Sequence, residues 1–250
     1  MHKFFTPKEL VSSHEARIVG EDVKHIYKVL RVTKGEKVTV NNQEGEEFLG
    51  EISSVSKQEV VIKIIKKLDV NNESNINIYL FQGLPKASKM DLIVQKATEL
   101  GFKEIIPTIT ERVDVKLKGE FKKLDRLQRI ALEASKQSKR TYIPKVKEPV
   151  DFSEIKAIFE QMDIVVVPYE NAQGHGIRNL VNTLDNKCEV KNIAVMVGPE
   201  GGFEENEIEE LKNLGAYIVT LGPRILRTET AGFVCGSLLQ YELGDIGGNS

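Results

Sequence analysis

Thiols and metal ligands are scarce in this chain. Its 250 residues include two cysteines, four histidines and no tryptophan. Cys188 and Cys235 have neither the spacing of a metal site nor the number of a disulfide framework, and the histidines are scattered. A metal centre or a serine–histidine–aspartate triad is therefore not expected. Cys235 lies in an apolar run typical of a small buried residue, which fits a reducing cytoplasm.

Long hydrophobic runs are also missing. No stretch approaches the roughly 18 uncharged apolar residues of a membrane span, and the first residues do not resemble a signal peptide. The fingerprints of a dinucleotide site, a phosphate loop, a zinc protease and a serine hydrolase are all absent. Hydrophobic content of 40% and charged content of 29% are ordinary for a soluble protein of one large or two modest domains.

Charge is unevenly distributed, although the net charge is only −2. Residues 116–140 hold nine Lys or Arg against three acids, whereas residues 200–210 hold six Glu and no base. A local basic face on a near-neutral protein favours one specific nucleic-acid contact over general coating of a polyanion. A solvated helix face is the simpler alternative for the charge run alone.

Residues 1–70 predict a small β-rich unit, a barrel that carries one helix. The helix is expected from Glu21 to about Leu30, with Val23, Ile26, Tyr27 and Leu30 on one stripe. The polar, turn-forming residues 69–75 are interpreted as a linker. The runs expected as strands are Ala16–Val19, Lys37–Val40 and Glu59–Ile65.

Residues 76–250 predict an α/β unit, because short apolar runs between helices indicate parallel strands buried on both faces. A capping box of Ser88 and Asp91 is expected to open the first helix, and Gly101 to stop it. The last helix is apolar nearly all round, so we expect it in the core or in a subunit interface. Expected strands are Ile76–Phe81, one from Ile105, Ile164–Val167, Ile193–Val197 and Tyr217–Leu221, and expected helices are 88–100, 119–138 and 229–243.

Two loops with Gly-Pro breaks follow strands late in the chain, at residues 198–202 and 221–231. Ligand sites of open sheets lie at the carboxyl ends of strands. Paired glycines let the backbone approach a ligand, and Arg224 and Arg227 suit phosphate binding beside an apolar slot unless they pair with nearby glutamates. Thr228 or Thr230 is a candidate cap for the last helix. The residues alone thus predict a nucleoside-type pocket.

These stretches resemble a known family. Gly198–Phe203 and Leu221–Ala231 are similar to two signatures of the RsmE-type small-subunit rRNA uridine-N3 methyltransferases of the SPOUT superfamily. Lys89–Gly101 resembles a third signature, and Val29-Leu-Arg31 with Lys34-Gly35 resembles the family's first-domain motif. The similarity covers nearly the whole chain. Departures include a single His25 where the family often has two histidines, and they lie at the expected RNA surface.

The resemblance implies an N-terminal PUA-like RNA-binding β-barrel over residues 1–70 and a C-terminal SPOUT α/β domain with a trefoil knot over residues 76–250. It implies a cytoplasmic homodimer that uses S-adenosylmethionine to methylate N3 of a uridine near the 3′ end of 16S rRNA, within the 30S subunit. Two alternatives stay open: a methyltransferase acting on another RNA, and a non-catalytic ribosome-assembly protein.

Residue roles are also implied by the resemblance, and no metal ligand is among them. Arg227, Arg224 and Glu200 become the catalytic candidates, with an arginine stabilising the uracil anion and Glu200 accepting its proton. Cofactor-binding candidates are Pro168, Tyr169, Glu170, Val197, Gly198, Pro199, Gly201, Gly202, Leu221, Gly222, Ile225, Leu226 and Ala231. RNA-binding candidates are Arg31, Lys34, Lys37, Lys122, Lys123, Arg126, Arg129 and Arg140.

Overall fold

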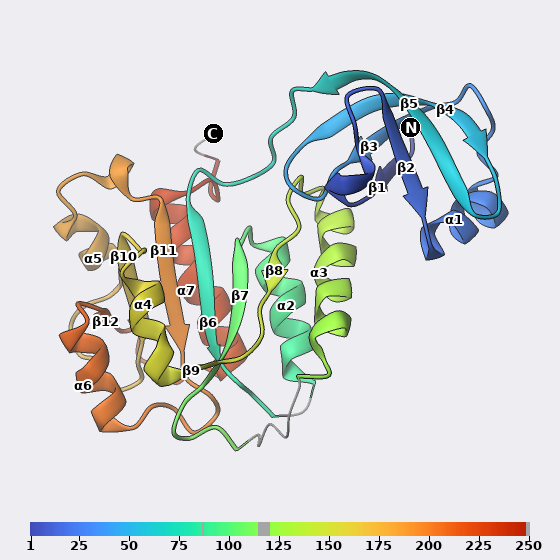
Figure 1. The fold of residues 1–250 in the computed structure, drawn as a ribbon. Helices are drawn as coiled ribbons and strands as arrows, with labels where there is room; N and C mark the ends of the chain where they lie inside the picture. The colour runs from blue at the N-terminus through green and yellow to red at the C-terminus, as the bar shows by residue number, and fades with distance from the viewer. Residues whose placement is uncertain (87, 115–120, 249–250) are drawn as a thin grey trace. The chain divides into compact units, whose positions relative to one another are not determined.

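The computed structural model describes residues 1–86, 88–114 and 121–248, which form two compact units (Figure 1). The first unit is Met1–Glu73 together with Lys139–Ile143, and the second is Ser74–Ser138 with Pro144–Ser250. The division falls inside the expected linker 69–75. The return of residues 139–143 to the first unit differs from the sequence-based domain boundaries.

Hydrogen bonds to the side chain of Glu73 connect residues 139–143 with the first unit. The Glu73 carboxylate accepts hydrogen bonds from the Arg140 guanidinium, from Thr141 N at 2.8 Å and from Tyr142 N at 2.9 Å. The Arg140 side chain is only 5% exposed. Arg140 was expected on an RNA-binding face, but its burial and its ion pair remove it from the exposed basic surface.

The first unit is built on one five-stranded sheet in the order β1-β3-β4-β5-β2. β1 pairs with β3 in parallel, and the other pairs are antiparallel. Register shifts between β4 and β5 let the sheet bend, and Thr6 Oγ1 donates to Arg17 O at 2.6 Å, which links the segment after β1 to the other edge. The strands are β1 (Lys3–Phe5), β2 (Glu15–Val19), β3 (Lys37–Asn41), β4 (Glu47–Val55) and β5 (Glu59–Leu68).

The expected helix of this unit is present but changes type midway. α1 (Glu21–His25) is followed by a π-helical turn, Ile26–Leu30, in which Arg31 N donates to Ile26 O. The extra residue in that turn rotates later side chains relative to α-helical spacing. Val23 and Ile26 are buried as expected, but Tyr27 is exposed, so its placement on the inner stripe was wrong.

The second unit is a seven-stranded parallel sheet in the order β12-β10-β11-β6-β7-β8, with β9 also pairing with β7. This confirms the parallel arrangement expected from the continuous apolar runs. Its strands are β6 (Asn77–Gly83), β7 (Glu104–Ile109), β8 (Lys145–Val146), β9 (Val150–Asp151), β10 (Ile164–Pro168), β11 (Asn192–Val197) and β12 (Tyr217–Val219).

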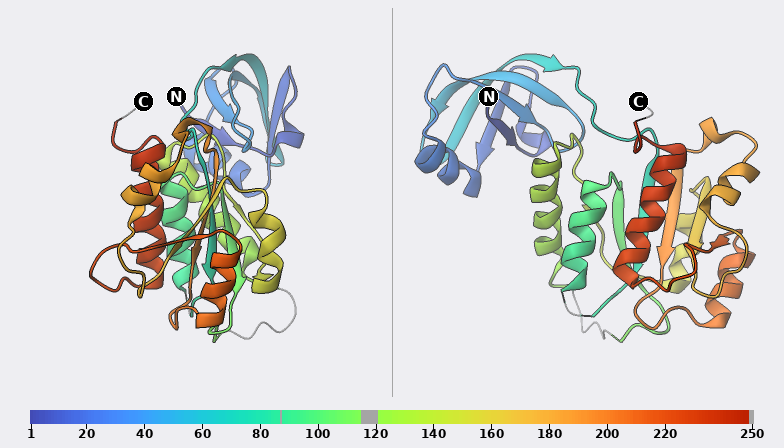
Figure 2. Two further views of the ribbon diagram at one scale, coloured as in Figure 1. Left: turned by 90° about the vertical axis from the view of Figure 1, so that its left-hand side faces the viewer. Right: turned by 180° about the vertical axis from the view of Figure 1, so that it is seen from behind.

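Helices cover both faces of this sheet (Figure 2). α4 and α6 pack on one face in a cluster centred on Phe81, Val167 and Met196, while α2 and α7 contact each other on the opposite face. The start expected for α3, near Gly119, lies outside the described residues. The helices are α2 (Lys89–Glu99), α3 (Leu124–Ser138), α4 (Ile155–Phe159), α5 (Ile177–Thr183), α6 (Glu205–Asn213) and α7 (Thr228–Leu243), with short 3-10 turns at Lys8–Leu10, Phe152–Glu154 and Lys187–Glu189.

The observed helix ends agree only in part with the caps and stops predicted from the sequence. Gly101 follows α2 with φ +83°, as expected for a left-handed stop. The capping interaction expected for Ser88 is absent, since its side chain makes no cap hydrogen bond. Gly236 lets α7 approach Phe102, because an added Cβ would lie 2.1 Å from that ring. Packing within the chain therefore accounts for this glycine.

Candidate active site

Three loops meet at the carboxyl edge of the second sheet. They follow β10, β11 and β12, and these strands stand next to one another in the order β12-β10-β11. Because the strands are parallel, their carboxyl ends share one edge, where open α/β sheets bind ligands. The three loops, together with the adjoining ends of β10, β11 and α7, contain the cofactor-binding residues expected from the sequence.

The loops enclose a cavity of about 370 Å³, within the usual range for small-molecule sites. A smaller hollow of about 100 Å³ adjoins it and shares Pro168, Glu170 and Ile225 with it. Every expected cofactor-binding residue lines one hollow or the other. Lys89, Phe203 and Thr228 also line the larger cavity and were not among the sequence candidates.

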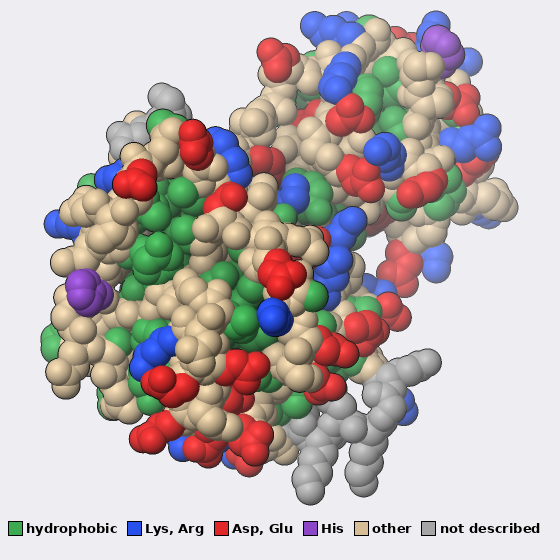
Figure 3. All heavy atoms as spheres, turned by 60° about the vertical axis from the view of Figure 1, so that its left-hand side comes forward, with side chains coloured by type: hydrophobic (Ala, Val, Ile, Leu, Met, Phe, Trp, Pro, Cys, Tyr) green, Lys and Arg blue, Asp and Glu red, His purple; other side chains and the backbone are tan. Residues whose placement is uncertain are grey.

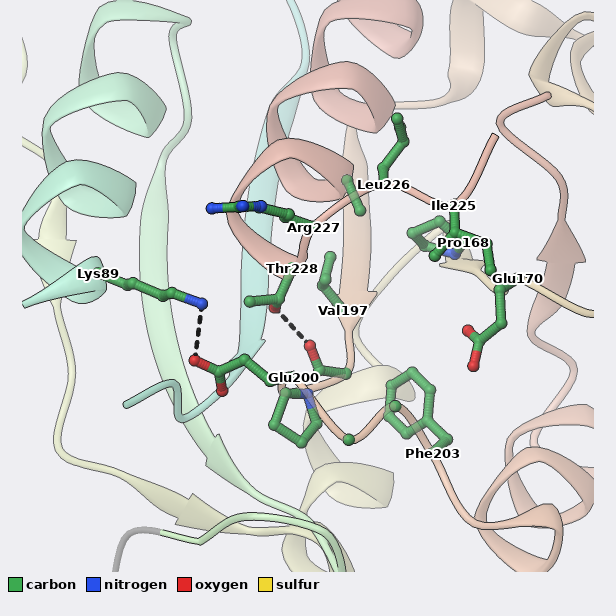
Figure 4. A pocket seen from close by; sticks show the side chains of 15 residues that line it. Lys89, Pro168, Glu170, Val197, Glu200, Phe203, Ile225, Leu226, Arg227 and Thr228 are labelled. Atoms are coloured by element: carbon green, nitrogen blue, oxygen red, sulfur yellow. Dashed lines mark hydrogen bonds and ion pairs between the residues drawn. The ribbon is translucent and has the colours of Figure 1, made fainter. Parts of the chain in front are cut away.

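Thr228 joins two of the loops through a buried hydrogen-bond chain. Its hydroxyl donates to Gly198 O at 2.6 Å (Figure 4) and accepts from Gln82 Nε2 at 2.7 Å. Gln82 is fully buried at the end of β6, so its amide fixes the direction in which the hydroxyl donates. The cap expected from Thr228 is therefore absent: α7 begins at Thr228, and the hydroxyl bonds the preceding loop instead.

Lys89 holds the tip of the 198–202 loop. Its ammonium lies 2.9 Å from Glu200 Oε1 and 3.6 Å from Glu229 Oε2, and Lys86 N also donates to Glu200. Partial burial alone would raise the pKa of Glu200, but the hydrogen bonds from Lys89 and from the backbone of Glu200 and Lys86 outweigh it and lower that pKa. These contacts favour the ionised form of Glu200.

Arg112 braces the same loop from outside the cavity. Its guanidinium donates to Gly201 O at 2.9 Å and to both carboxylate oxygens of Glu204 at 2.7 and 2.9 Å. Glu204 in turn opens α6 in a capping box with Glu207. The loop is thus tied at Gly198, Glu200 and Gly201 to three other segments of the chain.

The two loop arginines carry uncompensated charge. Arg224 and Arg227 are exposed, and neither side chain makes an ion pair or hydrogen bond with any residue that the structure describes. The alternative in which both pair with nearby glutamates is therefore excluded for those residues. Ile225 between them is 84% exposed at the rim of the cavity.

The cavity has charged groups at both ends. Arg227 extends to one side of the start of α7, where Lys89 is paired with Glu200, whereas Glu170 lies on the opposite side (Figure 4). Gly202, with φ +69°, is required beside Glu170, because an added Cβ would be strained and would lie 2.9 Å from Glu170 Oε1. A ligand that carries charges of both signs would be oriented by these ends.

The remaining RNA candidates lie on separate elements. Arg31, Lys34 and Lys37 are exposed in the first unit, and Lys122, Lys123, Arg126 and Arg129 are exposed at and within the start of α3. Arg126 pairs with Asp91 at 2.5 Å. On the face of the second unit shown in Figure 3, acidic side chains gather in the lower part. α6 carries the exposed acids Glu205, Glu209 and Glu210.

Neither a membrane helix nor a metal cluster is found in the described parts of the chain. None of the helices there is long and apolar enough to cross a bilayer. Over the same residues, no group of three or more His, Cys, Asp or Glu side chains is arranged to hold a metal ion.

The fold and cavity define an α/β protein with a ligand site at the carboxyl ends of parallel strands, joined to a small β unit. Residues 72–240 match the model of the RNA methyltransferase domain, and residues 18–65 match the RNA methyltransferase PUA domain. The chain is 35% identical to Ribosomal RNA small subunit methyltransferase E of Bacillus subtilis over 97% of both chains. It belongs to the ribosomal RNA small subunit methyltransferase E family.

Solved structures agree with this assignment. A putative methyltransferase from Legionella pneumophila, in complex with the bound cofactor SAM, superposes with a TM-score of 0.83 at 32% identity and 98% coverage of both chains. Ribosomal RNA small subunit methyltransferase E from Neisseria gonorrhoeae, bound to S-adenosyl methionine, has a TM-score of 0.81 at 29% identity, covering 98% of this chain and 99% of that one.

Proposed function

We propose that this chain methylates N3 of a uridine near the 3′ end of 16S rRNA, within the small ribosomal subunit, with S-adenosylmethionine as methyl donor. The observation that carries the proposal is the cavity built by the three loops in a chain of this family. The proposal includes a cytoplasmic location, where ribosomal subunits are found. Under the proposal, the loops of the second unit are threaded as a trefoil knot.

The cavity residues fit the donor, which supplies an electrophilic methyl group on a positively charged sulfur. Backbone groups around Gly198, Gly201 and Gly222 can approach an adenine closely, and Ile225 and Leu226 offer apolar contact. Glu170 suits a hydroxyl or ammonium group of the donor, whereas Arg227 stays available to a phosphate of the RNA.

The acceptor base must be unpaired and turned toward the cavity before it reacts, which costs a few kcal/mol unless the RNA already exposes it. With the donor bound, N3 would lose its proton to solvent and take the methyl group, and the carbon–sulfur bond would break with its electron pair left on sulfur, so that a neutral thioether would be the leaving group. Arg227 and Arg224 are free to hold an adjoining phosphate and to stabilise the uracil anion. Glu200 holds the loop through Lys89, and its lowered pKa disfavours the role of proton acceptor.

The proposal includes a homodimer. α7 exposes Leu238 and Tyr241 beside its half-buried Val234, which suits a subunit interface. Light scattering measures the mass in solution, and a monomer at micromolar concentration would contradict this part alone.

The direct test combines calorimetry with mapping of modified rRNA. S-adenosylmethionine should bind the purified protein, and a strain lacking the gene should lose one N3-methyluridine in 16S rRNA that the wild-type gene restores. Absence of binding would favour the non-catalytic assembly protein. Intact 16S methylation with a missing tRNA methyl group would favour the other RNA substrate.

A further inference from the structure

The π-helical turn of the first unit exposes two large apolar side chains that are two positions apart in sequence. Tyr27 is 44% and Val29 is 64% exposed, while Val23, Ile26 and Val32 belong to the buried core of the same unit. The turn is therefore held by buried side chains, and its outward-facing residues are exposed to solvent. π-turns are rare and are frequently found at functional sites.

The backbone after the turn is strained. Arg31 has φ +51°, in the left-handed region that non-glycine residues seldom occupy. Strain of this kind costs about 1–3 kcal/mol and clusters at binding and catalytic sites. Here it accompanies the closure of the turn, in which Arg31 N donates to Ile26 O at 2.9 Å.

Cations surround this apolar pair without carboxylate partners. Lys24, Lys28 and Arg31 lie within four residues of Tyr27, all three are exposed, and their side chains pair with none of the described residues. Between residues 24 and 37 the chain has five Lys or Arg and one acid. That acid, Glu36, is occupied by Thr33, whose N and Oγ1 donate to it at 2.6 and 2.7 Å. Glu36 and the acids Glu21 and Asp22 of α1 remain charged, but Lys24, Lys28 and Arg31 pair with none of them, so these cations are available to an external anion.

We propose that Lys24, Tyr27, Lys28, Val29 and Arg31, the π-turn surface, bind an unpaired RNA nucleotide whose base stacks on Tyr27. This inference rests on the proposed function and names an RNA contact beyond the methyl-transfer cavity. An aromatic ring among cations is the combination that holds single-stranded nucleic acid, because the base stacks while the cations contact its phosphates. Bases inside a duplex are already stacked and cannot use the ring.

Anisotropy titration of the full-length protein with labelled RNA tests the stacking. The probes are a single-stranded 16-mer taken from the 3′ region of 16S rRNA and the same 16-mer annealed to its complement. Tyr27→Leu should weaken binding of the single strand about 5-fold to 100-fold, whereas Tyr27→Phe, which keeps the ring, should stay within about 2-fold of wild type. Both variants should bind the duplex as the wild type does. Tyr217→Leu, at another exposed tyrosine, is the matched control and should change neither affinity.

The cations are tested separately through salt. Lys28→Ala should reduce the slope of log affinity against log salt concentration by about 1 unit for the single strand. Melting temperatures of the variants should match the wild type, because Tyr27 and Lys28 lie outside the core.

Equal single-strand affinity in Tyr27→Leu and wild type overturns the inference while leaving the proposed function intact. Equal losses for duplex and single strand also overturn it, because they indicate general attraction without stacking. If Tyr27→Leu instead loses binding to phosphatidylserine vesicles alone, the surface belongs to a membrane contact and the inference is wrong. A wild-type protein that binds S-adenosylmethionine but none of these RNAs counts against the RNA substrate of the proposed function itself.

Discussion

The hydroxyl of Thr228 offers the sharpest test of how the cavity is held. Thr228→Val keeps the shape of the side chain but removes the bond to Gly198 O and the acceptor for Gln82 Nε2. Gln82 Nε2 retains Gly83 O at 3.1 Å, so the greater loss falls on the Gly198 carbonyl. A buried polar group without a partner costs about 1–3 kcal/mol.

That cost should appear in ligand affinity. Gly198 and Thr228 both line the cavity, and their bond holds two of its loops at a fixed separation. About 1–3 kcal/mol corresponds to a rise of roughly 5-fold to 150-fold in the Kd for S-adenosylmethionine. Thr228→Ser keeps the hydroxyl and should bind within about 3-fold of wild type.

Isothermal titration calorimetry of the three proteins measures the Kd, and melting in the absence of ligand measures stability. Wild-type affinity together with a wild-type Tm in Thr228→Val would refute the role assigned to this hydrogen bond. An equal loss of affinity in the valine and serine variants would indicate that packing of the γ-methyl matters and the hydroxyl does not.

Three further variants follow from the site and from the first unit. Arg227→Ala should lower methyl transfer about 100-fold or more in a filter assay while the calorimetric Kd for S-adenosylmethionine stays within about 2-fold, and a transfer rate equal to wild type would remove Arg227 from the site. Glu200 has a pKa below its ordinary value, so its contribution to stability is present above the ordinary pKa and is lost as pH falls through the lowered one. Glu200→Gln should therefore flatten the acid-side decline of Tm below about pH 5, and an unchanged slope would contradict the tie to Lys89. Glu73→Gln leaves Arg140 buried without its carboxylate and should lower the free energy of unfolding in urea by about 3–5 kcal/mol. Lys67→Ala, which breaks the exposed ion pair with Glu46, is the control and should change that free energy negligibly.

Apolar continuity is what allowed the second unit to be predicted. β10 and β11 are buried along almost their whole length, so each is read directly from its run of Val, Ile, Ala and Met. β4 was missed because Gly50 and two serines interrupt its pattern. Gly50 is needed there, since an added Cβ would lie 2.4 Å from Ile62 Cγ2, and the adjoining register shifts break strict alternation.

The sequence predicted the loops of the candidate site but not the hydrogen bonds that join them to distant segments. Gly-Pro breaks mark the backbone turns at Gly198 and Gly222, and the arginines stand in the same loops. Gln82 and Thr228, however, are 146 positions apart, and no local pattern links them. The predicted position of Tyr27 on the inner stripe was also wrong. A single extra residue in a π-turn rotates the side chains that α-helical spacing would align.

The lining of the cavity also predicts the pH dependence of the reaction. The described lining residues include no histidine or cysteine, and the lowered pKa of Glu200 makes that carboxylate a poor proton acceptor near neutral pH. Rate enhancement must then come chiefly from placing the base and the methyl group in line and from the arginine charges. Single-turnover methyl transfer at saturating substrates should consequently rise from about pH 6 to about pH 9 with a slope near 1 in log rate, as the uracil proton is lost to solvent. A plateau beginning near pH 7 would reveal a group that titrates there, and this account of the chemistry would be wrong.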